Sequence, residues 1–347
     1  MRYKLLGNTG LRISELCLGT MTFGEEWGWG ASKEESRKIF EAFAEAGGNF
    51  VDTANLYTGG TSERITGELL SKRRGRFVLA TKYVMTMSPD DPNAGGSHRK
   101  NLVQSLEASL KRLGTDYVDL LWVHAHDVLT PVEETMRALD DVVRAGKALY
   151  VGISDAPAWV VSRANTLASL KDWTPYAALQ IRYGLADRTP ERDLLPMAKA
   201  LGLTVTPWGI LGGGVLSGKY RSPKDRPAGA RFAQDDAWAA ANVTERNLRI
   251  AEAVGTVAKE VGKTPSQVAL AWVRQQEPSG VIVPILGART LAQLADNLGC
   301  LEFALGPGHL AALEAASAVE PGFPHDFLVQ ARSSIYGKTF PLIDNHR

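Results

Sequence analysis

Several features that narrow the function of other proteins are scarce in this chain of 347 residues. Its two cysteines, Cys17 and Cys300, are too few for a disulfide framework and favour a reducing, cytoplasmic compartment. The formal net charge is only +1, so nothing favours nucleic acid or an acidic membrane surface as a partner. No apolar run is long enough to span a bilayer, and the polar start MRYKLLGNTG lacks the apolar stretch of a signal peptide.

A glycine-rich dinucleotide-binding motif is also missing. The first predicted strand, Leu16–Gly19, continues into TMTFG rather than into GxGxxG, which argues against a doubly wound open sheet. Strand and helix patterns instead alternate eight times, which predicts a (β/α)8 TIM barrel preceded by a β-hairpin about Gly7 and Asn8. We expect one domain over residues 1–347. The later strands are predicted over Asn49–Asp52, Phe77–Lys82, Tyr117–His124, Ala148–Ser154, Ala177–Tyr183, Thr204–Ile210 and Gly280–Ile285.

Three long segments interrupt this alternation. Residues 83–100 and 216–242 follow the third and seventh strands, so we expect them to lie over the C-terminal mouth of the barrel. The tail, from about residue 321 to 347, is expected to cover one rim of the pocket, with Phe327 or Tyr336 reaching it. At the first predicted helix, Ser32 and Glu35 have the spacing of a capping box.

Four polar residues stand at or just after the ends of three consecutive predicted strands. Asp52, Lys82 and His124 each end a strand, and Tyr57 follows Asp52 in the loop. In a parallel barrel the C-terminal ends of the strands converge on one mouth, where the active site forms. The pattern therefore predicts that these four side chains share one site.

These residue types suit the reduction of a carbonyl group. The reaction needs a hydride for the carbon and a proton for the oxygen, and a free tyrosine is an acid with a pKa near 10. The Lys82 ammonium is expected to lower the pKa of Tyr57 toward the working pH, while Asp52 pairs with Lys82. A neutral His124 would donate to the substrate oxygen and orient it.

Other interpretations are open at this point. A single aspartate or lysine at a strand end is more often part of an ordinary ion pair, and a single histidine there is more often structural. His124 and His126 could also bind a metal, but only Asp127 lies near them as a further ligand, so we expect no metal site. The joint occurrence on three consecutive strands is what favours catalysis.

The chain resembles the aldo-keto reductase family from about Leu5 to Asn297. The segments that carry the resemblance include LGNTGLRISELCLGTMTFG, NFVDTANLYTGGTSE, SLKRLGTDYVDLLWVH and GGGVLSGKY, in the family's order and spacing. The resemblance implies a barrel that reduces aldehydes or ketones with NADPH, usually in preference to NADH. It also implies the family's catalytic tetrad, with Tyr57 as general acid assisted by Lys82, Asp52 and His124.

The resemblance further implies residues that bind the cofactor. Around the nicotinamide these are Thr20, Met21, Asp52, Ser154, Gln180 and Trp208, of which Ser154 and Gln180 would bond the carboxamide and Trp208 would stack on the ring. Around the pyrophosphate they are Gly209, Ile210, Leu211, Gly212, Gly214, Ser217 and Lys219, with Arg231 closing over it. For the adenosine 2′-phosphate and adenine they are Gly287, Arg289, Gln293 and Asn297. A guanidinium suits a phosphate because it offers two parallel hydrogen bonds.

The chain departs from the family pattern at Gly209-Ile210, where many members have Ser-Pro, and at Asp155, where the family most often has asparagine. An ionised aspartate accepts a bond from the carboxamide but cannot donate one to it. Trp27 and Trp29 are expected to form an aromatic wall for the substrate beside Tyr57 and His124. An alternative function is a cofactor-binding regulatory or redox-sensing protein similar to potassium-channel β subunits, against which the complete tetrad argues. The sequence leaves open the physiological substrate and the oligomeric state, a homo-oligomer included.

Overall fold

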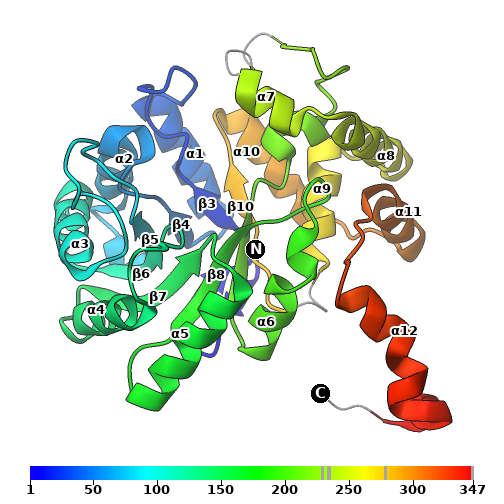
Figure 1. Cartoon of the computed structure of the whole chain (residues 1–347). Helices are drawn as coiled ribbons and strands as arrows, with labels where there is room; N and C mark the ends of the chain where they lie inside the picture. The colour runs from blue at the N-terminus through cyan, green and yellow to red at the C-terminus, as the bar shows by residue number, and fades with distance from the viewer. Residues whose placement is uncertain (228–229, 233–235, 277–279, 345–347) are drawn as a thin grey trace.

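The computed structural model describes residues 1–227, 230–232, 236–276 and 280–344, and its centre is a parallel sheet. In those ranges eight strands are ordered β10-β3-β4-β5-β6-β7-β8-β9, and helices surround them (Figure 1). The strands are β3 (Cys17–Gly19), β4 (Phe50–Asp52), β5 (Val78–Tyr83), β6 (Val118–Val123), β7 (Ala148–Ser154), β8 (Tyr176–Arg182), β9 (Thr204–Trp208) and β10 (Ile285–Gly287).

The last strand closes the barrel in two steps. Residues 281–283 pair with β9, where Val205 bridges Ile282, and β10 then pairs with β3, where Ile285 lies opposite Cys17. Pro284 separates the two steps, and it has no N–H to donate to a ladder. The strand predicted over Gly280–Ile285 is therefore displaced, because β10 begins at Ile285, but the predicted (β/α)8 barrel is confirmed.

Helices follow the strands, and most of these helices cover the outer face of the sheet (Figure 1). They are α1 (Lys33–Glu45), α2 (Thr61–Leu70), α3 (Arg99–Leu113), α4 (Val132–Arg144), α5 (Ala158–Lys171), α6 (Leu194–Ala200), α7 (Asp236–Asn242), α8 (Glu245–Val261), α9 (Pro265–Arg274), α10 (Leu291–Leu298), α11 (Pro307–Ser317) and α12 (His325–Tyr336). Ser32 caps α1 as predicted, accepting from the Glu35 N–H. The Glu35 carboxylate does not complete a capping box, because it accepts from the N–H of Leu291 at the start of α10, at 2.7 Å.

The barrel interior is filled by inward-facing side chains of one parity. Phe50, Ala80, Leu120 and Trp122 belong to this inner cluster, and the predicted N-terminal hairpin, β1 (Tyr3–Leu5) with β2 (Arg12–Ser14), is present next to it. Trp122 fits because Gly152 faces it: a Cβ on that glycine would lie 2.4 Å from the indole. The next inward-facing residues along β4, β5 and β6 are polar, and they lie at the C-terminal mouth of the barrel.

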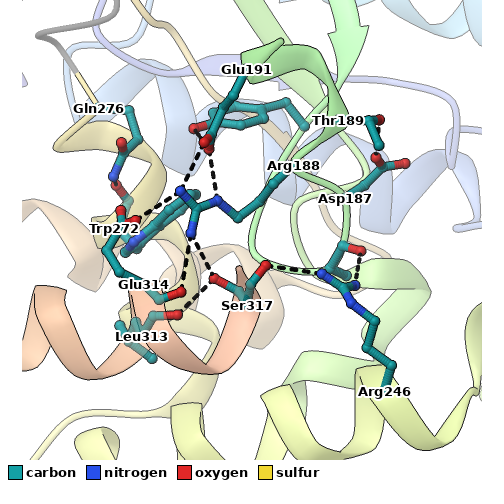
Figure 2. Close-up of polar contacts among 12 residues, drawn as sticks. Asp187, Arg188, Thr189, Glu191, Arg246, Trp272, Gln276, Leu313, Glu314 and Ser317 are labelled. Atoms are coloured by element: carbon teal, nitrogen blue, oxygen red, sulfur yellow. Dashed lines mark hydrogen bonds and ion pairs between the residues drawn. The ribbon is translucent and has the colours of Figure 1, made fainter. Parts of the chain in front are cut away.

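An arginine cluster fastens α11 to the barrel (Figure 2). Arg188 is buried and donates to both Glu191 carboxylate oxygens at 2.8 Å. The same guanidinium donates to Glu314 at 2.8 Å and to Ser317 at 3.1 Å on α11, and it lies 5.2 Å over the Trp272 ring of α9. The two glutamates raise the pKa of Arg188 against the opposing effect of burial, so this cation is neutralised within the fold.

The tail takes a different course from the one predicted. α12 projects away from the barrel beyond α11 (Figure 1). Phe327 is 57% exposed and Tyr336 is 48% exposed. Neither side chain reaches the pocket described below, so the tail does not cover its rim. None of the helices in the described ranges is long and apolar enough to cross a membrane.

Candidate active site

The four strand-end residues meet at the mouth of the barrel. Asp52 ends β4, Lys82 lies in β5, His124 follows β6, and Tyr57 begins a short 3-10 turn after β4. The Lys82 ammonium is fully buried and pairs with the Asp52 carboxylate. It also donates to the Thr53 carbonyl at 2.8 Å and lies 3.1 Å from the Tyr57 hydroxyl. The lysine thus connects a buried carboxylate with a phenol.

The electrostatics of this group fix its protonation states. Burial lowers the pKa of Lys82, but the Asp52 carboxylate and Tyr57 raise it by more, so the lysine stays charged. Burial raises the pKa of Tyr57, and the Lys82 ammonium only partly offsets this. The expected net lowering of the Tyr57 pKa is therefore wrong for the protein alone, because desolvation of the phenolate outweighs the ammonium. Tyr57 is held as the protonated phenol.

His124 lies against Tyr57 and stays neutral. The two ring centroids are 5.9 Å apart in an edge-to-face arrangement. Burial and the nearby Lys82 charge lower the pKa of His124 to about 3. Its Nδ1 atom is buried and has no hydrogen-bond partner among the described residues. A neutral imidazole of this kind can serve a ligand as a hydrogen-bond donor without adding charge.

Two tryptophans from the loop after β3 stand beside the phenol. Trp27 meets the Tyr57 ring edge-on at 6.3 Å, and Trp29 lies 5.6 Å from Trp27. Trp29 also lies under the Arg231 guanidinium at 5.0 Å. The two tryptophans therefore do not form one aromatic wall as predicted. Trp27 faces Tyr57, while Trp29 lines the cavity described next.

A cavity of about 320 Å³ opens next to these residues, between the ends of β9 and β10. It is lined by eleven of the residues predicted for the cofactor, namely Gly209, Ile210, Leu211, Gly214, Ser217, Lys219, Arg231, Gly287, Arg289, Gln293 and Asn297. Gly214 has a φ of +94°, and a Cβ there would lie 2.5 Å from the Lys219 ammonium. The positive φ favours glycine here, and a side chain at this position would displace the end of Lys219 from its present place at the cavity.

The cavity collects positive charge. Burial and the charges of Arg289 and Arg231 lower the pKa of Lys219. Burial also lowers the pKa of Arg231, and Arg289 adds to this effect. Within the described residues neither Lys219 nor Arg231 forms an ion pair. Cations held together in this way favour binding of an anion, and a phosphate site after the last two strands is typical of the barrel fold.

The other residues predicted for the cofactor lie outside this cavity. Thr20 is buried and bonded to Ser62 at 2.9 Å, and the Met21 sulfur lies 4.0 Å from Arg231. Gln180 donates to Asp52 at 3.2 Å. Ser154 is buried at the end of β7, and Gly212 is buried beside the cavity. Trp208, at the end of β9, donates its indole N–H to Asp155 at 3.1 Å.

Further residues line the cavity that sequence reasoning did not select. They are Thr22, Gly213, Ser266, Leu270, Ile285, Leu286, Ala288 and Asp296. Gly213 carried a signal, since it belongs to the run Gly212–Gly214. Ser266 and Asp296 lie on α9 and α10 and carry no local motif. Among the described residues, no three or more His, Cys, Asp or Glu side chains gather as they would around a metal ion.

Comparison with known proteins agrees with this geometry. The model of the aldo/keto reductase family matches residues 15–318. The chain belongs to that family. The chain is similar to norsolorinic acid reductase of Aspergillus flavus, with 36% identity over 343 residues, 96% of this chain and 85% of that protein. It is also 38% identical to norsolorinic acid reductase B of Dothistroma septosporum over 343 residues, 94% of this chain and 84% of that one.

A third relative is named for a different activity. The chain is 36% identical to the aryl-alcohol dehydrogenase [NADP(+)] of Phanerodontia chrysosporium over 340 residues, 93% of this chain and 87% of that protein. Family membership together with these reductase and dehydrogenase relatives supports an oxidoreductase that reduces carbonyl groups.

Proposed function

We propose that this chain is an NADPH-dependent reductase of aldehydes and ketones that works as a single barrel domain. Tyr57 is the general acid, and Lys82, Asp52 and His124 assist it. The observation that carries the proposal is the buried Lys82, which pairs with Asp52 and lies 3.1 Å from the Tyr57 hydroxyl. The one partner we assign is a small-molecule carbonyl substrate.

The residues present fit a phosphorylated nicotinamide cofactor. The cavity offers the cations Lys219, Arg231 and Arg289 at the ends of the last two strands, and Gly214 leaves room for the ammonium. Arg289 is proposed to hold the 2′-phosphate, and the segment from Gly209 to Lys219 the pyrophosphate. The bound cofactor would supply a hydride for the carbonyl carbon.

The chain's own residues handle the proton. Tyr57 is protonated in the resting protein, so it can donate to the substrate oxygen. The Lys82 ammonium stabilises the phenolate that is left, because opposite charge favours the ionised form. His124 is neutral and beside Tyr57, so it can donate a second bond to the same oxygen without competing for the proton. Asp52 keeps Lys82 charged and in place.

We also propose that the substrate is an aryl carbonyl compound. Trp27 stands edge-on to Tyr57 and offers an aromatic surface next to the acid. Aromatic rings pair favourably in offset or edge-to-face arrangements. One relative is named for aryl alcohols, which supports the same substrate class.

The variant Y57F tests the role of the acid. We expect turnover of an aryl aldehyde to fall by about 10²- to 10⁴-fold, the usual worth of general acid catalysis, with the Kd for NADPH nearly unchanged. Y83F is the matched control, since Tyr83 is the neighbour of Lys82 but its hydroxyl donates to Ser97 away from the site. Full turnover by Y57F would remove Tyr57 as the acid. A wild-type protein that binds NADPH but turns over no carbonyl would favour the regulatory alternative.

A further inference from the structure

Asp155 holds an unusual position at the mouth of the barrel. It follows β7 directly and has a φ of +44°, in the left-handed region that aspartate and asparagine tolerate better than most residues. Its carboxylate accepts the indole N–H of Trp208 at 3.1 Å. The backbone of Asp155 is fixed as well, since its N–H donates to the Gln180 carbonyl at 3.1 Å. The carboxylate is therefore held beside the Trp208 ring.

This carboxylate differs from its neighbours in lacking a direct ion-pair partner among the described residues, although the charges of Lys82 and Arg182 act on it from further away. Asp52 is paired with Lys82, and Asp187 lies 3.2 Å from the Arg182 guanidinium. Within the described residues Asp155 forms no ion pair. Burial raises the pKa of Asp155, while the Trp208 and Ser154 bonds and the charges of Lys82 and Arg182 partly oppose this. The carboxylate thus places a negative charge at the edge of the Trp208 ring, over which the Arg182 guanidinium lies at 6.0 Å.

We propose that Asp155 makes the site prefer the oxidised form of the nicotinamide cofactor over the reduced form. The inference rests on the proposed cofactor-binding function and on the expectation from the family resemblance that Trp208 stacks on the nicotinamide. The oxidised ring carries one positive charge, and the reduced ring carries none. An unpaired carboxylate beside the ring attracts the charged form and leaves the neutral form unaffected. A site of this kind holds the oxidised cofactor tightly and suits alcohol oxidation as well as carbonyl reduction.

The substitution D155N separates charge from position. Asparagine has the same shape, tolerates the left-handed backbone, and keeps a side-chain oxygen that can accept from the Trp208 indole. Only the negative charge is removed. D155A removes the charge and the indole bond together, so the difference between the two variants reports the positioning of Trp208. D116N is the charge-matched control, because the exposed Asp116 precedes β6 and lies at the opposite end of the barrel.

The test is isothermal titration of the full chain with NADP+ and, separately, with NADPH at pH 8, where the carboxylate is ionised. In D155N we expect the ratio of Kd for NADP+ to Kd for NADPH to rise about 3- to 10-fold over wild type, as for a partly solvated charge pair a few ångströms apart. D116N should leave the ratio unchanged. A ratio that is the same in D155N and wild type overturns the proposal, even if both affinities fall together.

A failure of the proposed function would look different. In that case the wild-type protein would bind neither NADP+ nor NADPH, and both the function and this inference would fall. If wild type binds both forms and only the D155N ratio is unchanged, the function stands and the inference alone is wrong.

Discussion

Among the described residues, the surroundings of Arg188 and those of the cavity cations Lys219, Arg231 and Arg289 are built in opposite ways. At the first, Arg188 meets two carboxylates and the Ser317 hydroxyl, and the aromatic face of Trp272 covers it (Figure 2). At the second, Lys219, Arg231 and Arg289 line one cavity. The surroundings raise the pKa of Arg188 and lower the pKa values of Lys219 and Arg231.

The difference shows which cations serve the fold and which serve a ligand. A guanidinium with two carboxylate partners already has its counter-charge, so its loss should cost stability. Cations that repel one another across a cavity cost some stability, and an anion that enters the cavity relieves that cost. For Arg188 and Arg231 the neighbouring charges thus distinguish the two roles more sharply than burial does, since both guanidiniums are shielded by protein.

The largest effect on stability is expected for R188M. The change leaves Glu191 and Glu314 without their partner, and breaking a buried pair costs about 3–5 kcal/mol. Both carboxylates are partly exposed, so we expect a smaller loss here. The free energy of unfolding, measured by urea denaturation, should fall by about 2–4 kcal/mol. R246M is the control in the same cluster, because Arg246 donates to the carbonyls of Ala186 and Ser317, and we expect a smaller loss. Equal losses in the two variants would contradict a special role of the carboxylates.

For R289A we expect the reverse of R188M, with little change in stability and a large loss of NADPH affinity. The free energy of unfolding should stay within about 0.5 kcal/mol of wild type, as for most surface changes. The Kd for NADPH should rise about 10- to 150-fold, the worth of a charge-assisted hydrogen bond, while the Kd for NADH changes little. R332A is the control of equal charge, since Arg332 lies on α12 over the Phe340 ring. If NADPH and NADH weakened equally, the 2′-phosphate would have to bind elsewhere.

The sequence predicts the fold well because the patterns that indicate strands, helices and inward-facing positions depend on residues close together in the chain. Asp52, Lys82 and His124 face the barrel interior, as do the apolar residues two positions before each of them. The strand pattern alone therefore predicts that these three residues meet. The displaced last strand shows the limit of this reasoning. Residues 281–283 and β10 pair with different neighbours, β9 and β3, and no local pattern states which neighbour a strand will meet.

The site is less predictable wherever a side chain chooses between partners or two effects oppose each other. Glu35 fits a local capping box, yet its carboxylate serves α10, which is distant in sequence. The pKa of Tyr57 depends on burial against one ammonium, and the sequence supplies the ammonium but not the depth. The Asp155–Trp208 bond joins the ends of β7 and β9. Each of these outcomes is set by distances that exist only after folding.

His124 is a buried group that the fold keeps neutral, and the pH dependence of stability tests this. Burial holds the pKa of His124 near 3, far below its unfolded value of about 6.5. The unfolded chain therefore binds one more proton between these values, so stability falls as pH drops from about 6.5 toward 3. We expect wild type to lose about 1.6 kcal/mol more than H124Q between pH 6.5 and pH 5. Urea denaturation at both pH values checks this, and parallel losses would show that His124 titrates normally.

The smallest effect is expected for K219Q, and its sign is what matters. Removing the ammonium relieves its repulsion with Arg231 and Arg289, so the free energy of unfolding should rise. The rise should be at most about 0.5 kcal/mol, because the Lys219 residue is largely open to solvent even though protein partly surrounds its ammonium. The Kd for NADPH should rise about 3- to 10-fold, since a solvated point charge contributes less to phosphate binding than a forked guanidinium. The same variant would thus be more stable and bind more weakly. A K219Q protein that lost stability would place Lys219 with Arg188, among the cations that hold the fold.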